Sequence, residues 1–365
     1  MGKREREKGR LITTLNEHLN NIHETLQTLD QTAASSLEKV SWNDVLKMGE
    51  EVSKQATIVG MLWTAEAPEA KAVEENMAAY FNILQGFLLH THGSTVGAGP
   101  TLSSAIHASV QQVVDSSFKL MKESVNLYGS HNKDQAHAMP QFVGVVWEAC
   151  TALKKTPVTN ITAIGRAMTK VAVSMKDVLR EMKELKPSPS DPNEAPDDDS
   201  TNADSGAQDD ENSSLGDIGN DLSPEEMKVA QLAIGIVLET LVVIKELIRM
   251  ITGLLKLENP DDNDKFVDSL EKLLKFCQGF GVQIDELGAC LYPPQEVLAM
   301  KAVSEKISSI TNELQKEVES LSSPSEAFVQ VCDGLRNSLK QLDSELDCSS
   351  TTDLEAKLQN VSVSN

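Results

Sequence analysis

Apolar residues recur every three or four positions along most of this 365-residue chain, and this period constrains the fold more than any other feature. Near the start they form the single stripe Leu11, Leu15, Leu19, Ile22, Leu26 and Leu29. Such spacing places all six side chains on one face of an α-helix. No segment alternates polar and apolar residues for long enough to predict a strand, and aromatic residues, which sheets favour, make up only 4% of the chain. The sequence therefore predicts an all-α fold.

Prolines and helix-capping residues divide this pattern into ten helices, six before and four after an acidic segment. Ser41 followed by Asp44 resembles a capping box. The string Ser223-Pro224-Glu225-Glu226 offers an N-cap, a proline in the first turn and two acids near the positive end of the helix dipole. The predicted helices cover residues 11–29, 41–65, 68–88, 101–128, 140–153, 160–185, 224–257, 264–291, 294–321 and 324–346.

The acidic segment Pro187–Ser223 contains nine Asp, two Glu and no Lys or Arg, which is half of the net charge of −22. It cannot bury enough apolar surface to offset the entropy lost on ordering. We therefore expect two antiparallel helical bundles of four or five helices, similar to those of talin and vinculin, joined by a disordered acidic linker. The predicted organisation is an N-terminal helix over 1–36 whose packing is undecided, an N-terminal bundle over 37–186, the linker over 187–223, a C-terminal bundle over 224–346 and a flexible tail over 347–365.

The charge balance argues against direct binding of nucleic acid, because a surface that tracks phosphates needs clustered Lys and Arg. A membrane span is not predicted either, although residues 229–255 are strongly apolar. Glu239, Lys245, Glu246 and Arg249 interrupt that stretch, and charges in the middle of a span are costly. The five cysteines are widely spaced and odd in number, so they are expected to be free thiols.

The sequence contains no motif that predicts catalytic, cofactor-binding or metal-binding residues, so neither an enzyme nor a cofactor is expected. His90, His92 and His107 form the densest histidine group, but neighbours two positions apart point to different faces of a helix. Two Ser-Pro pairs make Ser188 and Ser223 candidate phosphorylation sites. Ser223 has an alternative role as the N-cap of the helix that follows.

Three short strings, taken in order, resemble the cyclin-D-interacting protein family. They are Val146-Trp147-Glu148-Ala149-Cys150, then Met175-Lys176-Asp177 through Glu181-Met182, and Leu291-Tyr292-Pro293-Pro294. The resemblance implies an all-helical, non-enzymatic regulator that binds D-type cyclins and helix-loop-helix transcription factors. It also implies a negative regulator of cell-cycle progression in the cytoplasm and nucleus, and it assigns no role to an individual residue.

The sequence leaves two function hypotheses open. One is the regulatory binding protein, and the other is a cytoskeletal or adhesion-type adaptor built from helical bundles. The physiological partner, the surface that binds it, the oligomeric state and phosphorylation of the linker stay undecided at this point.

Overall fold

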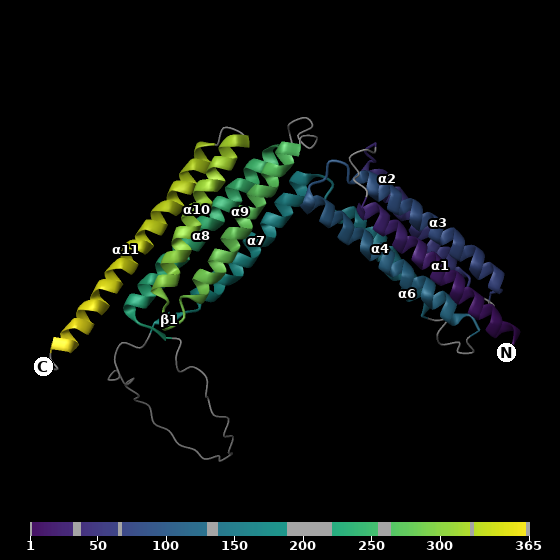
Figure 1. The fold of residues 1–365 in the computed structure, drawn as a ribbon, viewed down its shortest axis with the longest axis horizontal. Helices are drawn as coiled ribbons and strands as arrows, with labels where there is room; N and C mark the ends of the chain where they lie inside the picture. The colour runs from purple at the N-terminus through teal and green to yellow at the C-terminus, as the bar shows by residue number, and fades with distance from the viewer. Residues whose placement is uncertain are drawn as a thin grey trace, which may run out of the picture. The chain divides into compact units, whose positions relative to one another are not determined.

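The computed structural model contains two compact units, which are described separately below (Figure 1). The first unit comprises Met1–Ile164 with Glu258–Glu271, and the second comprises Gly165–Leu257 with Lys272–Asn365. The structure describes residues 2–31, 38–64, 68–129, 138–187, 221–254, 264–321 and 325–362. Over these residues it contains ten α-helices, six before and four after the acidic segment, which confirms the predicted all-α class.

The first unit is a bundle of five helices followed by a short 3-10 turn, Leu153–Lys155. Its helices are α1 (Lys3–Gln31), α2 (Trp42–Met61), α3 (Ala70–Ser94), α4 (Pro100–Leu127) and α6 (Met139–Ala152). Helix α2 packs on α3 and α6, and α4 packs on α6. Helix α1 packs on α3 and α4, so the packing that the sequence left undecided is within this unit.

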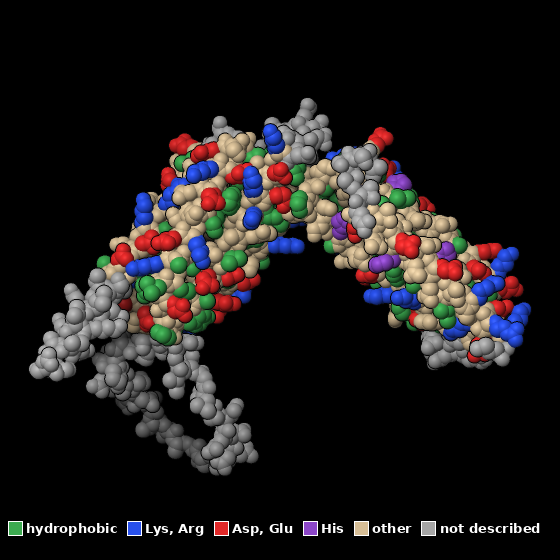
Figure 2. All heavy atoms as spheres, in the orientation of Figure 1, with side chains coloured by type: hydrophobic (Ala, Val, Ile, Leu, Met, Phe, Trp, Pro, Cys, Tyr) green, Lys and Arg blue, Asp and Glu red, His purple; other side chains and the backbone are tan. Residues whose placement is uncertain are grey.

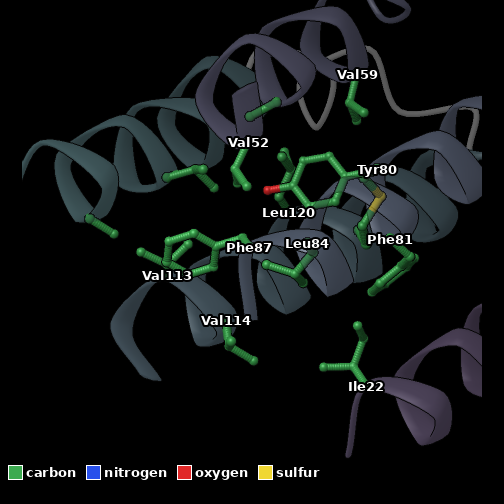
Figure 3. Close-up of a cluster of buried hydrophobic side chains, with 14 of the residues drawn as sticks. Ile22, Val52, Val59, Tyr80, Phe81, Leu84, Phe87, Val113, Val114 and Leu120 are labelled. Atoms are coloured by element: carbon green, nitrogen blue, oxygen red, sulfur yellow. The ribbon is translucent and has the colours of Figure 1, made fainter. Parts of the chain in front are cut away.

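The core of the first unit is built around α3 (Figure 3). Tyr80, Leu84 and Phe87 are fully buried there, and they face side chains from α2 and α4. Burial of a Leu or Phe side chain, such as Leu84 or Phe87, contributes about 1.5–3 kcal/mol relative to exposure. The Tyr80 hydroxyl donates a hydrogen bond to Ser117 Oγ at 2.8 Å, and burial raises the pKa of Tyr80. The predicted stripe of α1 lies on the same core, with Leu11, Leu15 and Ile22 buried.

The second unit is also formed by five helices, which alternate in direction along the chain (Figure 1). They are α7 (Asn160–Lys183), α8 (Pro224–Leu254), α9 (Asp264–Ala289), α10 (Val297–Leu321) and α11 (Glu326–Ser362), of which α7 belongs to this unit from Gly165 and α9 from Lys272. The structure places most of α7 in the second unit, whereas the sequence-based division placed this helix in the first bundle. From Gly165 onward it lies in the second unit, because its apolar face packs on α9 through the contacts described below.

Helix α11 is longer than the sequence predicted. A flexible tail was expected after Leu346, which is the last buried side chain among those that the structure describes, but the helix continues to Ser362. The run Leu354-Glu355-Ala356-Lys357 consists of strong helix formers, which favour continuation of the helix.

The acidic segment begins and ends within the second unit. Residues 188–220 lie outside the described part of the chain, so the disorder predicted for the linker concerns residues that the structure does not describe. Two-residue strands flank them, β1 (Lys186–Pro187) and β2 (Asp221–Leu222). The strands pair in parallel, with Lys186 opposite Asp221. Helices α7 and α8, which precede and follow these strands, belong to the same unit.

Helix α8 has a core face and an apolar outward face. Within the described residues, one helical stretch, Pro224–Gly253, is long and apolar enough to cross a membrane by length and composition, and 44% of its most apolar window is buried. Those two criteria are weak grounds for a span, because central bundle helices also meet them. Ile236 and Val243 are buried in the unit, whereas Leu238 and Val242 are each 43% exposed.

Candidate protein-binding site

The residues singled out for metal chemistry do not converge. Among the described residues there is no group of three or more His, Cys, Asp or Glu side chains placed to hold a metal ion. His90 Nδ1 lies 2.9 Å from the carbonyl oxygen of Gly86 on its own helix, and His107 on α4 is exposed.

Ser223 lies at the start of α8 and forms the predicted cap. Its backbone N–H donates to Glu226 Oε2 at 2.9 Å, and the Glu226 N–H donates to Ser223 Oγ at 3.2 Å. This reciprocal pair is a capping box. The hydroxyl is therefore engaged as the N-cap in this structure. Ser188, the other candidate phosphorylation site, lies outside the described residues.

The first of the three sequence strings lies on α6 in the first unit. Its residues divide between core and surface: Val146 and Cys150 are buried, whereas Trp147 is 46% exposed. The Trp147 indole N–H donates to Ser53 O at 3.2 Å and to Thr57 Oγ1 at 3.1 Å, which fixes the ring against α2. Ile58 and Met61 are exposed on that helix next to Thr57 and one turn beyond it. A half-exposed, immobilised tryptophan is a common anchor in protein interfaces.

The other two strings converge in the second unit, where α7 and α9 lie side by side. A Cβ placed on Gly281 would be 3.1 Å from Val171 Cγ1, and one on Gly288 would be 2.9 Å from Val178 Cγ1. Both pairs are separated by seven residues in the same direction, so α7 and α9 run parallel with a heptad seam. The two glycines permit this close approach, because larger residues would clash with the valines.

A pocket of about 300 Å³ lies between the C-terminal ends of these helices, and we refer to it as the α7–α9 pocket. It is lined by Val178, Glu181, Met182, Leu185, Asp285, Gly288, Ala289 and Tyr292. Met182 and Gly288 are buried, whereas Glu181, Asp285 and Tyr292 are exposed. The pocket therefore combines an apolar interior with a rim that carries two carboxylates and a phenol.

The two rim carboxylates are not neutralised by the protein. Across the described part of the chain, neither the Glu181 nor the Asp285 side chain forms an ion pair or a side-chain hydrogen bond. Arg180, next to Glu181 in sequence, pairs instead with Asp177 at 3.2 Å. On the face shown in Figure 2, acidic and basic side chains are interspersed over both units. The α7–α9 pocket thus presents negative charge that is free to meet a cation.

Comparison with known proteins identifies the family. The family domain described as "Grap2 and cyclin-D-interacting, N-terminal" matches residues 44–188, and the domain described as "Grap2 and cyclin-D-interacting, C-terminal" matches residues 207–316. The chain belongs to this family. The family-level resemblance inferred from the three strings is therefore confirmed.

A curated relative of the Grap2 and cyclin-D-interacting family supports the same assignment. The chain is 23% identical over 213 residues to a protein of Xenopus laevis named Cyclin-D1-binding protein 1 homolog. The alignment covers 58% of this chain and 59% of the relative, so it spans less than two thirds of the relative's length.

The two family regions do not correspond to the two compact units. The N-terminal region extends through α7, whereas most of α7 packs in the second unit with α9 of the C-terminal region. The α7–α9 pocket is therefore built from both regions. Two of the three strings contribute residues to the pocket, but the sequence alone did not predict that they lie together. The available signal was the matching seven-residue spacing of Val171 with Val178 and of Gly281 with Gly288.

Proposed function

We propose that this chain is a non-enzymatic regulatory protein that binds D-type cyclins, helix-loop-helix transcription factors or both. Binding would restrain cell-cycle progression, and it would take place in the cytoplasm and nucleus. The observation that carries this proposal is the family match over both the N-terminal and C-terminal regions. The name of the Xenopus laevis relative, which describes cyclin D1 binding by that protein, supports it.

The physical character of the surface agrees with binding rather than catalysis. The three strings that resemble the family contribute to two sites, a fixed tryptophan on α6 and the α7–α9 pocket with its charged rim. Protein interfaces commonly combine a buried apolar anchor with a polar rim of this kind. A net charge of −22 also favours rapid encounter with a basic partner.

The test is direct binding by the purified full-length chain. Immobilised D-type cyclins and helix-loop-helix factors should each be titrated at physiological salt, with far-ultraviolet circular dichroism showing that the chain is helical. Saturable binding to at least one of them, with a dissociation constant in the micromolar range or tighter, is expected. Failure to bind any of them with correctly folded material would overturn the proposal.

The helical-bundle adaptor is a second candidate function, favoured by α8. This helix is strongly apolar yet only partly buried, and Leu238 and Val242 form an outward apolar face. Helices of this type can exchange one packing partner for another. Co-sedimentation with actin filaments distinguishes the two candidates: a pellet containing the chain supports the adaptor, and cyclin binding without co-sedimentation removes it.

A further inference from the structure

We propose that the α7–α9 pocket binds a basic segment of a partner protein. One large apolar side chain of that segment enters the pocket, and flanking Lys or Arg residues pair with Glu181 and Asp285. This inference deepens the proposed function and rests on it for the identity of the partner. The chemistry of the pocket itself is argued from the residues that line it.

The shape of the pocket suits a side chain rather than a cofactor. Its volume of about 300 Å³ is at the lower end of the range for ligand pockets. The walls are Val178, Met182 and Leu185 from the α7 side and Ala289 from α9, and Gly288 leaves space between them. Tyr292 stands exposed at the edge, where its ring can cover an inserted side chain. A Leu, Met or Phe side chain is the matching occupant.

The charge of the pocket determines what flanks that side chain. Glu181 and Asp285 lie on different helices at the rim and have no cationic partner among the described residues. Leu185 of the pocket is followed directly by β1, so the acidic segment is attached to the chain at this end of the unit. Residues 188–220 contain ten Asp or Glu and no Lys or Arg. Both features attract a basic partner and repel an acidic one.

The same charges argue against other occupants. Anionic lipid and nucleic acid would be repelled by the rim, and a second copy of this chain would bring a further net charge of −22. A divalent cation alone would find only two carboxylates, which do not form a metal-binding group with a third ligand within the described ranges.

The experiment uses the full-length chain and a defined probe, a fluorescently labelled 14-residue amphipathic peptide of leucine and lysine. Its affinity is measured by fluorescence anisotropy at two salt concentrations. The charge variant combines Glu181→Gln with Asp285→Asn, and the filling variant is Ala289→Trp. The matched control combines Glu305→Gln with Glu313→Gln on α10, which removes the same charge from exposed positions elsewhere in the unit.

We expect the charge variant and the filling variant each to weaken peptide binding by about tenfold or more, because each removes one of the two recognition elements. The control should change it less than about twofold. Raising the salt concentration should weaken binding to the wild-type chain more than binding to the charge variant. Equal peptide affinity for the wild type, the charge variant and the filling variant would overturn the pocket proposal.

A cyclin titration separates this inference from the proposed function. If a D-type cyclin binds the wild-type chain and the peptide competes with it, both proposals are supported. If the cyclin binds equally to the wild type and both pocket variants, the pocket proposal is wrong and the function stands. If no cyclin or helix-loop-helix factor binds but the peptide binds in a pocket-dependent manner, the proposed function is wrong and the pocket chemistry stands.

Discussion

Replacing Gly288 with alanine should destabilise the second unit, even though alanine is the better helix former. The new Cβ would lie 2.9 Å from Val178 Cγ1, whereas carbon atoms in contact prefer about 3.5–4.0 Å. Val178 cannot turn away freely, because a β-branched side chain has one strongly preferred rotamer in a helix. Helices α7 and α9 must therefore separate by a fraction of an ångström along their seam.

The magnitude follows from comparison with Gly235, a glycine of α8 in the same unit. A Cβ on Gly235 would meet no atom within 4 Å, so Gly235→Ala should stabilise by about 0.5–1 kcal/mol through helix propensity alone. Gly288→Ala gains the same propensity term but adds an overpacking cost of about 1–3 kcal/mol. The two variants should therefore differ by about 1–3 kcal/mol, with Gly288→Ala the less stable.

Urea denaturation can measure this difference with an internal reference. All three tryptophans, Trp42, Trp63 and Trp147, belong to the first unit, so their fluorescence reports that unit, while far-ultraviolet circular dichroism reports both. Neither substitution should move the fluorescence midpoint, and only the dichroism component of the second unit should shift. A Gly288→Ala chain as stable as the Gly235→Ala chain would refute the close approach of α7 and α9.

Three further outcomes are expected. Phe87→Ala should lower the free energy of unfolding of the first unit by about 3–5 kcal/mol, because Phe87 is fully buried; a loss below about 1 kcal/mol by tryptophan fluorescence would contradict its core position. Ser223→Ala should cost about 0.5–2 kcal/mol by removing the N-cap of α8, and Ser223→Asp, which can also cap, should recover most of that loss in the same dichroism assay. Among the cysteines only Cys348 is exposed, and burial raises the pKa of Cys150 and Cys277 to about 12. Ellman's reagent at pH 8 should therefore label one thiol rapidly in the folded chain, and rapid labelling of several thiols would show that the other side chains are accessible. The free energy of unfolding should also fall as the pH rises above 9, because the unfolded state releases its thiol protons at a lower pH than the folded state does.

The helices could be predicted from the sequence because their signals are local. The stripe from Leu11 to Leu29 does face the core, through Leu11, Leu15 and Ile22 and the partly buried leucines between and after them. The caps at Ser41 and Ser223 also form as predicted, with their hydroxyls accepting from Asp44 N–H and Glu226 N–H.

The position of α7 could not be predicted in the same way. Periodicity shows that a helix has an apolar face but not which helix covers that face. The sequence-based division instead placed the boundary at Pro187, where the composition changes. Most of α7 precedes that boundary in sequence but packs in the second unit with helices that follow it. The α7–α9 pocket was missed for the same reason, because its lining comes from residues about 100 positions apart, such as Glu181 and Asp285.

The pairing of β1 with β2 removes any length requirement from the acidic segment. Because Pro187 and Leu222 are neighbours in the folded unit, the chain between them has no span to bridge. For a flexible connection, the entropic cost of bringing the two ends together rises only slowly with length, by about 0.6 kcal/mol for each doubling. Evolution or an engineer can thus shorten, extend or replace this segment at little cost to the helices, and its acidity can be tuned independently of the bundle that carries it.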